Sequence, residues 1–161
     1  ITTNYQLSSR EQLLNEVLTD ILTKSIQLKG KLNTEIAEWL SVTYQNNITL
    51  SNTQYENQHF DDILIQEHLL NFNFYPTSNQ YIGFDTEYYN NNFSTNNQEN
   101  YFLNLNYRYT LKKSRIDLEL NWNNILNTKE FTTVFNSSFS YTQSTYKLRP
   151  SQLLLSMKFR F

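Results

Sequence analysis

The side chains best suited to metal binding or acid–base chemistry lie close together near the middle of the chain. His59, Asp61, Asp62 and His68 are all potential metal ligands. Their spacing matches no ligand set that helices or turns present to zinc or calcium, so we expect solvated loop residues and no metal site. The sequence also contains no motif for a Ser–His–Asp triad and no glycine-rich phosphate loop. It therefore predicts neither an enzyme nor a bound cofactor.

Five charged residues towards the C-terminal end have a more regular arrangement. Asp117 and Glu119 are two residues apart, Lys158 and Arg160 are two residues apart, and Arg108 lies upstream of both pairs. Residues two apart share a face of a β-strand, and opposite charges on adjacent strands help to set their register. We expect these residues to form one charge cluster on a wet face. The alternative is a simple solvated lining without specific pairs.

The charges belong to segments in which apolar and polar residues alternate, the pattern of strands with two different faces. In the last segment the expected lipid-facing positions are Leu153, Leu155, Met157, Phe159 and Phe161. The same alternation predicts about seven long strands, near residues 21–32, 39–51, 62–75, 81–90, 100–111, 115–134 and 146–161. Residues 9–22 depart from it, because their leucines also fit helical spacing. The sequence leaves two alternatives for that segment, a short loop helix or an irregular strand.

The links between the predicted strands alternate in length. Short links fall at residues 33–38, 76–80 and 112–114, and long polar links fall at 51–61, 91–99 and 135–145. Outer-membrane barrels have this asymmetry, with tight periplasmic turns and longer extracellular loops. The long links carry aromatic residues that we expect to contact neighbouring loops or a ligand: Tyr55, Phe60, Phe93, Phe139 and Tyr141.

Composition narrows the class of protein. The 161 residues include no cysteine, and a net charge of −2 gives no reason to expect a nucleic-acid partner. An aromatic content of 16% argues against disorder. A soluble β-sandwich also alternates, but its strands average about 5–6 residues, whereas these predicted strands are long enough to cross a bilayer at a tilt.

The C-terminal strands resemble those of a known family. The stretch from Asn121 to Phe131 (NWNNILNTKEF) is similar to the penultimate-strand motif of TonB-dependent receptors, which are outer-membrane transporters. The stretch from Arg149 to Phe161 (RPSQLLLSMKFRF) resembles their closing strand. The family often has Gly-Arg before that strand, where this chain has Leu148 and Arg149. Residues upstream of 121 agree with the family only in the alternation of strands with short and long links.

The resemblance implies that residues 1–161 are the C-terminal part of a 22-stranded transmembrane β-barrel in a Gram-negative outer membrane. It implies a plug in the barrel, energy coupling through TonB by a part of the receptor outside this chain, and a surface lipoprotein as a further partner. The imported solute would be a siderophore, cobalamin, an oligosaccharide or a peptide. The chain starts without an initiator Met or an export signal, so we expect a piece of a longer protein.

Seven strands cannot all be paired without further strands, so we expect an open, curved sheet and no closed barrel. The alternative function is that of a non-transporting structural or adhesive β protein, such as a glycan-binding β-sandwich module.

Overall fold

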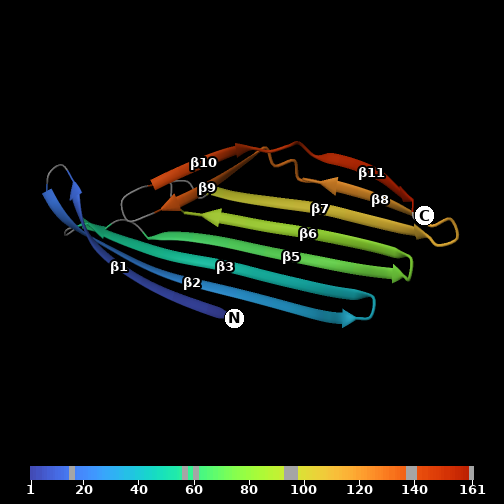
Figure 1. Ribbon diagram of the computed structural model, residues 1–161, viewed down its shortest axis with the longest axis horizontal. Helices are drawn as coiled ribbons and strands as arrows, with labels where there is room; N and C mark the ends of the chain where they lie inside the picture. The colour runs from blue at the N-terminus through green and yellow to red at the C-terminus, as the bar shows by residue number, and fades with distance from the viewer. Residues whose placement is uncertain (15–16, 56–57, 60–61, 93–97, 137–140, 160–161) are drawn as a thin grey trace.

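The computed structural model describes residues 1–14, 17–55, 58–59, 62–92, 98–136 and 141–159. These residues are all-β, and no helix among them is long and apolar enough to span a bilayer. Eight long strands form one antiparallel sheet, in the order β1-β2-β3-β5-β6-β7-β8-β11 (Figure 1). Their bounds are β1 Thr2–Leu14, β2 Val17–Ala37, β3 Leu40–Tyr55, β5 Ile63–Thr77, β6 Gln80–Asn91, β7 Gln98–Leu111, β8 Ile116–Asn123 and β11 Gln152–Phe159.

Three short strands complete the described fold. The two-residue strand β4 (Gln58–His59) pairs with the end of β3. Strands β9 (Glu130–Asn136) and β10 (Tyr141–Lys147) form a separate two-stranded sheet. The main sheet is open, because β1 and β11 each pair with one neighbour only in the described part of the chain. The expectation of an open sheet is therefore confirmed.

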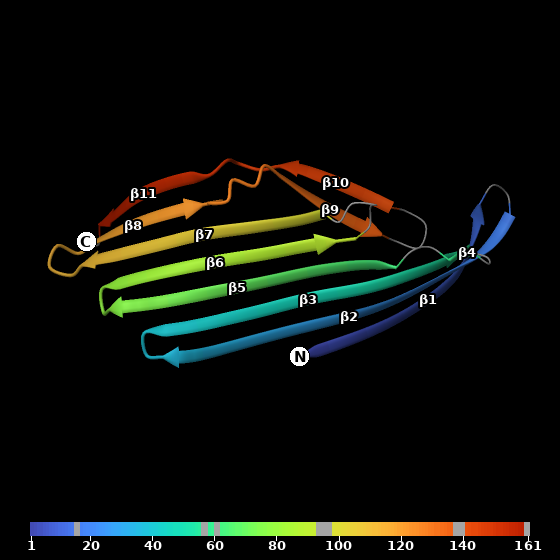
Figure 2. The ribbon, with the colours of Figure 1, turned by 180° about the vertical axis from the view of Figure 1, so that it is seen from behind.

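The two ends of the sheet differ in their connections. Tight turns at residues 38–39, 78–79 and 112–115 join successive strands at one end, which also holds the C-terminal end of β11 (Figures 1 and 2). The strand ends that flank the three longer links lie at the opposite end. We call the first end the short-turn end. This arrangement agrees with the alternation of short and long links in the sequence.

The prediction of about seven strands is wrong at the N-terminus. Residues 2–14 form the extra strand β1, and β2 begins at Val17 instead of residue 21. Cα pairing continues to Leu13 opposite Leu18 and Leu14 opposite Val17. Residues 9–22 are therefore strand wherever they are described. Residues 2–14 pair with β2 at every register position, and these ladder hydrogen bonds outweigh leucine spacing that suits a helix equally well.

The last two predicted strands are also wrong as continuous elements. The segment 115–134 is divided into β8 and β9, and the segment 146–161 is divided into β10 and β11. Asn124 and Asn127 have φ angles of 51° and 55°, values that residues in a strand do not adopt. Asparagine tolerates this left-handed conformation better than most side chains. Both strands are therefore interrupted at the same height of the sheet.

Register separates the side chains into two faces. One row of Cα partners crosses six strands as Val42, Phe72, Phe84, Leu105, Trp122 and Leu153. The neighbouring row, on the other face, reads Thr43, Asn71, Asp85 and Asn104. We call these the apolar face and the polar face. The buried hydrophobic core of the described chain is small and consists of Ile21, Ile63 and Tyr89.

Candidate functional site

The apolar face is open to its surroundings although it is made of large hydrophobic side chains. On β11, Leu155 is 77% exposed and Leu153 is 62% exposed. The face continues over β1 to β8 through further exposed residues, among them Tyr5, Leu28, Leu50, Phe84 and Trp122. Contiguous exposed apolar surface of this extent marks a surface that meets protein or membrane.

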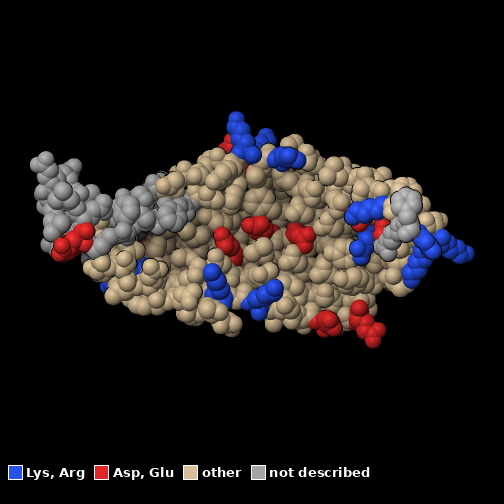
Figure 3. Space-filling model, in the orientation of Figure 1, with Lys and Arg blue, Asp and Glu red and all other residues tan. Residues whose placement is uncertain are grey.

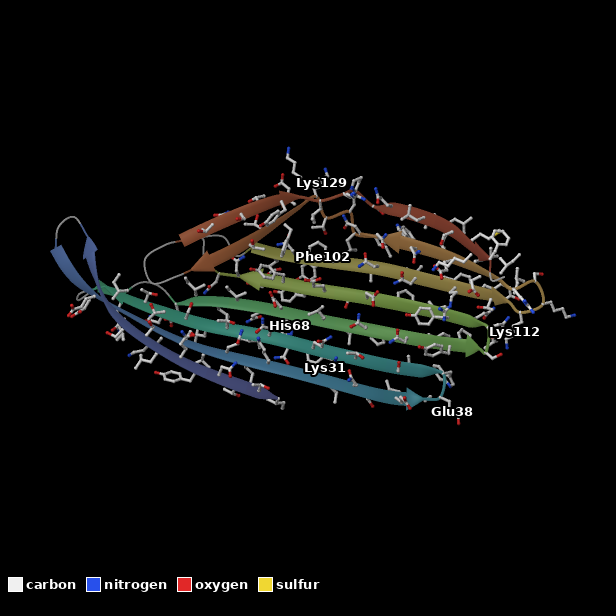
Figure 4. All side chains as sticks on the ribbon, viewed as in Figure 1. Lys31, Glu38, His68, Phe102, Lys112 and Lys129 are labelled. Carbon is white, nitrogen blue, oxygen red and sulfur yellow. The ribbon has the colours of Figure 1, made fainter. Side chains whose placement is uncertain are left out.

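A row of aromatic side chains crosses the apolar face obliquely, from near the short-turn end on β3 to near the opposite end on β7. Tyr44, His68, Tyr88 and Tyr101 form an aromatic row across β3, β5, β6 and β7, with successive ring centroids 6.0, 6.0 and 4.8 Å apart. Tyr44 Oη and His68 Nδ1 are 2.7 Å apart. Figure 4 labels His68 in the middle of the sheet. Rings with polar atoms at their tips suit a boundary between an apolar and a wet environment.

Polar atoms continue immediately beyond the aromatic row. Asn90 Nδ2 donates to Tyr88 Oη at 2.8 Å, and Tyr101 Oη donates to Glu99 Oε2 at 3.1 Å. At the short-turn end Trp39 packs edge-on against Phe74, with ring centroids 5.1 Å apart. Aromatic side chains thus lie at the short-turn end of the apolar face and, on β6 and β7, near its other end.

The polar face carries charge as well as amides. Acidic side chains gather at the centre of the face that Figure 3 shows, with basic side chains below them and near the short-turn end. By register the central acids are Glu67 on β5 and Asp85 and Glu87 on β6. Lys29 and Lys31 occupy the same face on β2. A surface of mixed charge suits contact with water or with a polar partner.

Amide side chains hold the central carboxylates. Asp85 accepts hydrogen bonds from Asn71 Nδ2 at 2.6 Å and from Asn106 Nδ2 at 3.0 Å. Glu67 Oε2 accepts one from Asn47 Nδ2 at 2.9 Å, and Asn47 Oδ1 accepts one from Gln27 Nε2 at 3.1 Å. The amide–carboxylate contacts link β3, β5, β6 and β7, and the amide–amide contact of Gln27 adds β2. Our sequence interpretation missed them, although asparagines at alternate strand positions were the available signal.

The structure brings together part of the predicted charge cluster. Lys158 Nζ lies 2.7 Å from Glu119 Oε2, and Glu119 is the register partner of Arg108. Asp117 is buried and accepts a hydrogen bond from Thr110 Oγ1 at 2.7 Å. All four residues lie on the polar face, while the fifth, residue 160, lies outside the described residues.

Arg108 has a second neighbour in an aromatic ring. Its guanidinium carbon lies 5.5 Å from the ring centroid of Tyr81, a cation–π distance. The same ring extends over Gly83, where an added Cβ would lie 2.5 Å from Tyr81 Oη. That hydroxyl donates to Asn73 Oδ1 at 2.9 Å. Gly83 therefore leaves the space that this ring occupies.

Asn124 ties together the interruptions in the last two strands. Its Oδ1 accepts from Thr128 N at 2.9 Å, and its Nδ2 donates to Thr128 O at 2.9 Å and to Arg149 O at 2.8 Å. Asn127 Oδ1 accepts from Ser151 N at 3.1 Å. These contacts lie within the motif from Asn121 to Phe131 and join it to the segment that precedes β11.

Phe131 of the β9–β10 hairpin contacts the main sheet. The ring of Phe131 lies edge-on to Tyr89 and Phe102, with centroid distances of 5.0 and 5.6 Å. Tyr89 belongs to β6, and Phe102, labelled in Figure 4, belongs to β7. Tyr89 is 4% exposed. This cluster anchors the hairpin to the sheet.

Several sequence-predicted residues are described only in part. Residues 60, 61, 93, 139 and 161 lie outside the described chain, and only the backbone is described for Tyr55, His59 and Tyr141. Of the other candidate metal ligands, His68 belongs to the aromatic row, and Asp62 Oδ1 accepts from Asn52 Nδ2 at 2.7 Å. No cluster of three potential ligands occurs within the described ranges.

The chain matches no protein-family model, no curated protein and no solved structure.

Proposed function

We propose that this chain forms part of the wall of a bacterial outer-membrane β-barrel that imports a scarce solute. The observation that supports this most directly is the exposed apolar face, with Leu155 77% and Phe159 59% exposed on the last strand. A soluble β-sandwich buries such a face under a second sheet. No second sheet covers it in the described part of the chain. An exposed apolar surface of this kind suits contact with the acyl chains of lipids.

The height of the apolar face fits a bilayer. On β7 the outward positions run from Leu111, at the short-turn end, to Tyr101 in the aromatic row. Ten residues extend about 33 Å along a strand. With the usual barrel tilt of about 40°, this gives a height of ~25 Å, the height of the apolar band in outer-membrane barrels.

The polar face would then line the lumen of the barrel. Its mixed charges and amides suit a wet interior, and further strands of the same receptor would pair with the free edges of β1 and β11. We assign the chain a role in transport and no catalysis.

The resemblance of residues 121–161 to TonB-dependent receptors supports active import as the function. In that interpretation a plug occupies the lumen, and TonB acts through a part of the receptor outside this chain. A surface lipoprotein is a further candidate partner. The solute would belong to the classes such receptors import: siderophores, cobalamin, oligosaccharides or peptides. A glycan-binding β-sandwich is the competing proposal, and it requires a cover for the apolar face.

Two adjacent substitutions on β11 test which face meets lipid. Leu155 lies on the apolar face and Ser156 lies on the polar face, opposite Glu119. An arginine at the lipid-facing mid-plane costs about 2–4 kcal/mol. We expect Leu155→Arg to abolish assembly into lipid vesicles, measured as protease-resistant, heat-modifiable protein. Ser156→Arg should assemble normally, because its charge would lie in the lumen beside a carboxylate.

Equal assembly of the two variants would contradict the assignment of the faces. Normal folding of Leu155→Arg in buffer without lipid would instead favour a sandwich that is completed by a partner.

A further inference from the structure

The turn at residues 112–115 concentrates positive charge at the short-turn end. Lys112, Lys113 and Arg115 are all exposed. Lys112 Nζ donates to Ser78 Oγ at 2.7 Å on the neighbouring turn, and no ion pair involves these three residues within the described chain. Arg115 has a φ of 53°, a conformation that glycine or asparagine adopts more easily. The turn therefore places a cation at a position where glycine or asparagine would adopt the backbone conformation at a lower free-energy cost.

This cationic turn directly adjoins the apolar face. Leu111 and Ile116 flank it and are register partners, and Ile116 pairs on its other side with Phe159. Lys and Arg can extend their apolar stems along such a surface while their charges stay in water. The cations are thus held at the level where the apolar face ends.

The turn at residues 38–39, further along the same end of the sheet, has the opposite charge. It consists of Glu38 and Trp39, and Trp39 is 49% exposed. Figure 4 labels Glu38 and Lys112 at the same end of the sheet, on separate turns. One rim of the molecule therefore carries a cationic turn beside β8 and an anionic turn beside β3.

We propose that the cationic turn binds the phosphate groups of anionic phospholipids in the leaflet that meets the short-turn end. The inference rests on the proposed function, in which the apolar face contacts lipid acyl chains. A phosphate at this turn would pair with cations that have no carboxylate partner among the described residues, and its acyl chains would cover the face next to β8. The attraction of one Lys or Arg to an anionic membrane surface corresponds to about a fivefold change in an equilibrium constant, and this sets the scale of the expected local enrichment of anionic lipid.

The two tryptophans of the chain can report local lipid composition. Trp122 lies on β8, six residues from Ile116, or about 20 Å along the strand. This is the path of an acyl chain whose headgroup sits at the cationic turn. Trp39 lies beside Glu38 on the other turn and serves as an internal reference. A Trp39→Phe variant isolates the first reporter, and Trp122→Phe isolates the second.

The experiment places the full protein in vesicles of equal phosphatidylglycerol and phosphatidylcholine, with brominated acyl chains on one lipid at a time. We expect brominated phosphatidylglycerol to quench Trp122 about fivefold more strongly than brominated phosphatidylcholine, and Trp39 to show no such preference. The preference should vanish in 1 M salt, where the Debye length falls to about 3 Å. This salt test needs no turn variant and so is independent of folding defects.

A matched pair of double variants separates the turn from overall charge. Lys112→Gln with Lys113→Gln should sharply reduce the preference, because only Arg115 then remains in the turn, and Lys29→Gln with Lys31→Gln, on the polar face, should retain it. Equal quenching of Trp122 by both lipids, or loss of the preference in both double variants, would overturn this inference and leave the proposed function intact. If neither lipid quenched either tryptophan, the proposed function itself would be wrong.

Discussion

Asn124 shows how a single side chain can shape the end of the sheet. Its left-handed backbone turns β8 away from a continuous strand, and its amide joins the two segments that flank the interruption. Aspartate in its place would keep the acceptor but lose the donor to Arg149 O. Alanine would lose both and would also strain the backbone. Asparagine is thus the side chain that combines a tolerated φ with both polar functions.

We expect Asn124→Gly to lower the free energy of unfolding by about 2–3 kcal/mol, because glycine keeps the left-handed φ but loses three side-chain hydrogen bonds of roughly 1 kcal/mol each. Urea titration of the protein in lipid vesicles measures this. Asn33→Gly is the control, since Asn33 is exposed on β2 and glycine in a strand costs at most about 1 kcal/mol. Similar losses in the two variants would show that the contacts of Asn124 contribute little.

The sequence predicts which face a side chain occupies but not which neighbour it meets. Alternation correctly groups Arg108, Asp117, Glu119 and Lys158 on one face. It cannot show that Lys158 meets Glu119 instead of its register partner Asp117, because that choice depends on the twist of β11 against β8 and on side-chain rotamers. The amide contacts of Asp85 escaped prediction for a related reason: asparagine is also a common turn residue, so its presence does not by itself indicate a contact within the sheet.

At the scale of elements, the β9–β10 hairpin is a semi-independent unit. It pairs with no strand of the main sheet in the described structure and contacts it through Phe131. Edge-to-face aromatic pairs contribute about 0.5–1.5 kcal/mol each beyond area burial. Two such pairs together contribute about 1–3 kcal/mol to the docking of the hairpin on the main sheet.

We therefore expect Phe131→Ala to destabilise the hairpin locally by about 1–3 kcal/mol. Backbone amides of β9 and β10 should exchange with deuterium roughly tenfold to a hundredfold faster, while those of β11 keep their protection. Tyr146→Ala is the matched control, because Tyr146 is the register partner of Phe131 but is 54% exposed. Faster exchange in β11 as well would show that the hairpin and the closing strand unfold as one unit.

Element boundaries were the least predictable part of the fold. The segment from Ile116 to Val134 contains no proline or glycine, and its only signal for the break after Asn123 is a cluster of asparagines, which also occur within the strands of this chain. The break depends on hydrogen bonds to Arg149 and Ser151, which are distant in sequence. At the N-terminus, residues 2–14 alternate weakly, and only pairing with β2 makes them a strand.

At the scale of the whole molecule, the two ends of the sheet give a test of orientation. The chain has no native cysteine, so single cysteines can be placed at either end. Ser94 lies in the link between β6 and β7, and Ser114 lies in the turn between β7 and β8. The conservative change from serine to cysteine is the same in both.

If the short-turn end faces the periplasm, an impermeant maleimide added to intact cells should label Ser94→Cys and leave Ser114→Cys unlabelled. After the outer membrane is permeabilised, both variants should react. Labelling of Ser114→Cys in intact cells would invert the orientation. Labelling of neither variant after permeabilisation would mean that these positions are buried by other parts of the protein.

The amide–carboxylate contacts of the polar face have a consequence for how the strands find one another. A slip of two residues between neighbouring strands moves them by about 7 Å, yet it leaves every apolar side chain on the same face. Hydrophobic burial alone therefore discriminates poorly between the correct alignment and a two-residue error. Such an error between β5 and β6 would separate Asn71 from Asp85, which would lose one of its two amide donors. The same error between β3 and β5 would separate Asn47 from Glu67. During assembly these polar pairs would favour the correct register over a register shifted by two residues, which hydrophobic alternation alone does not distinguish.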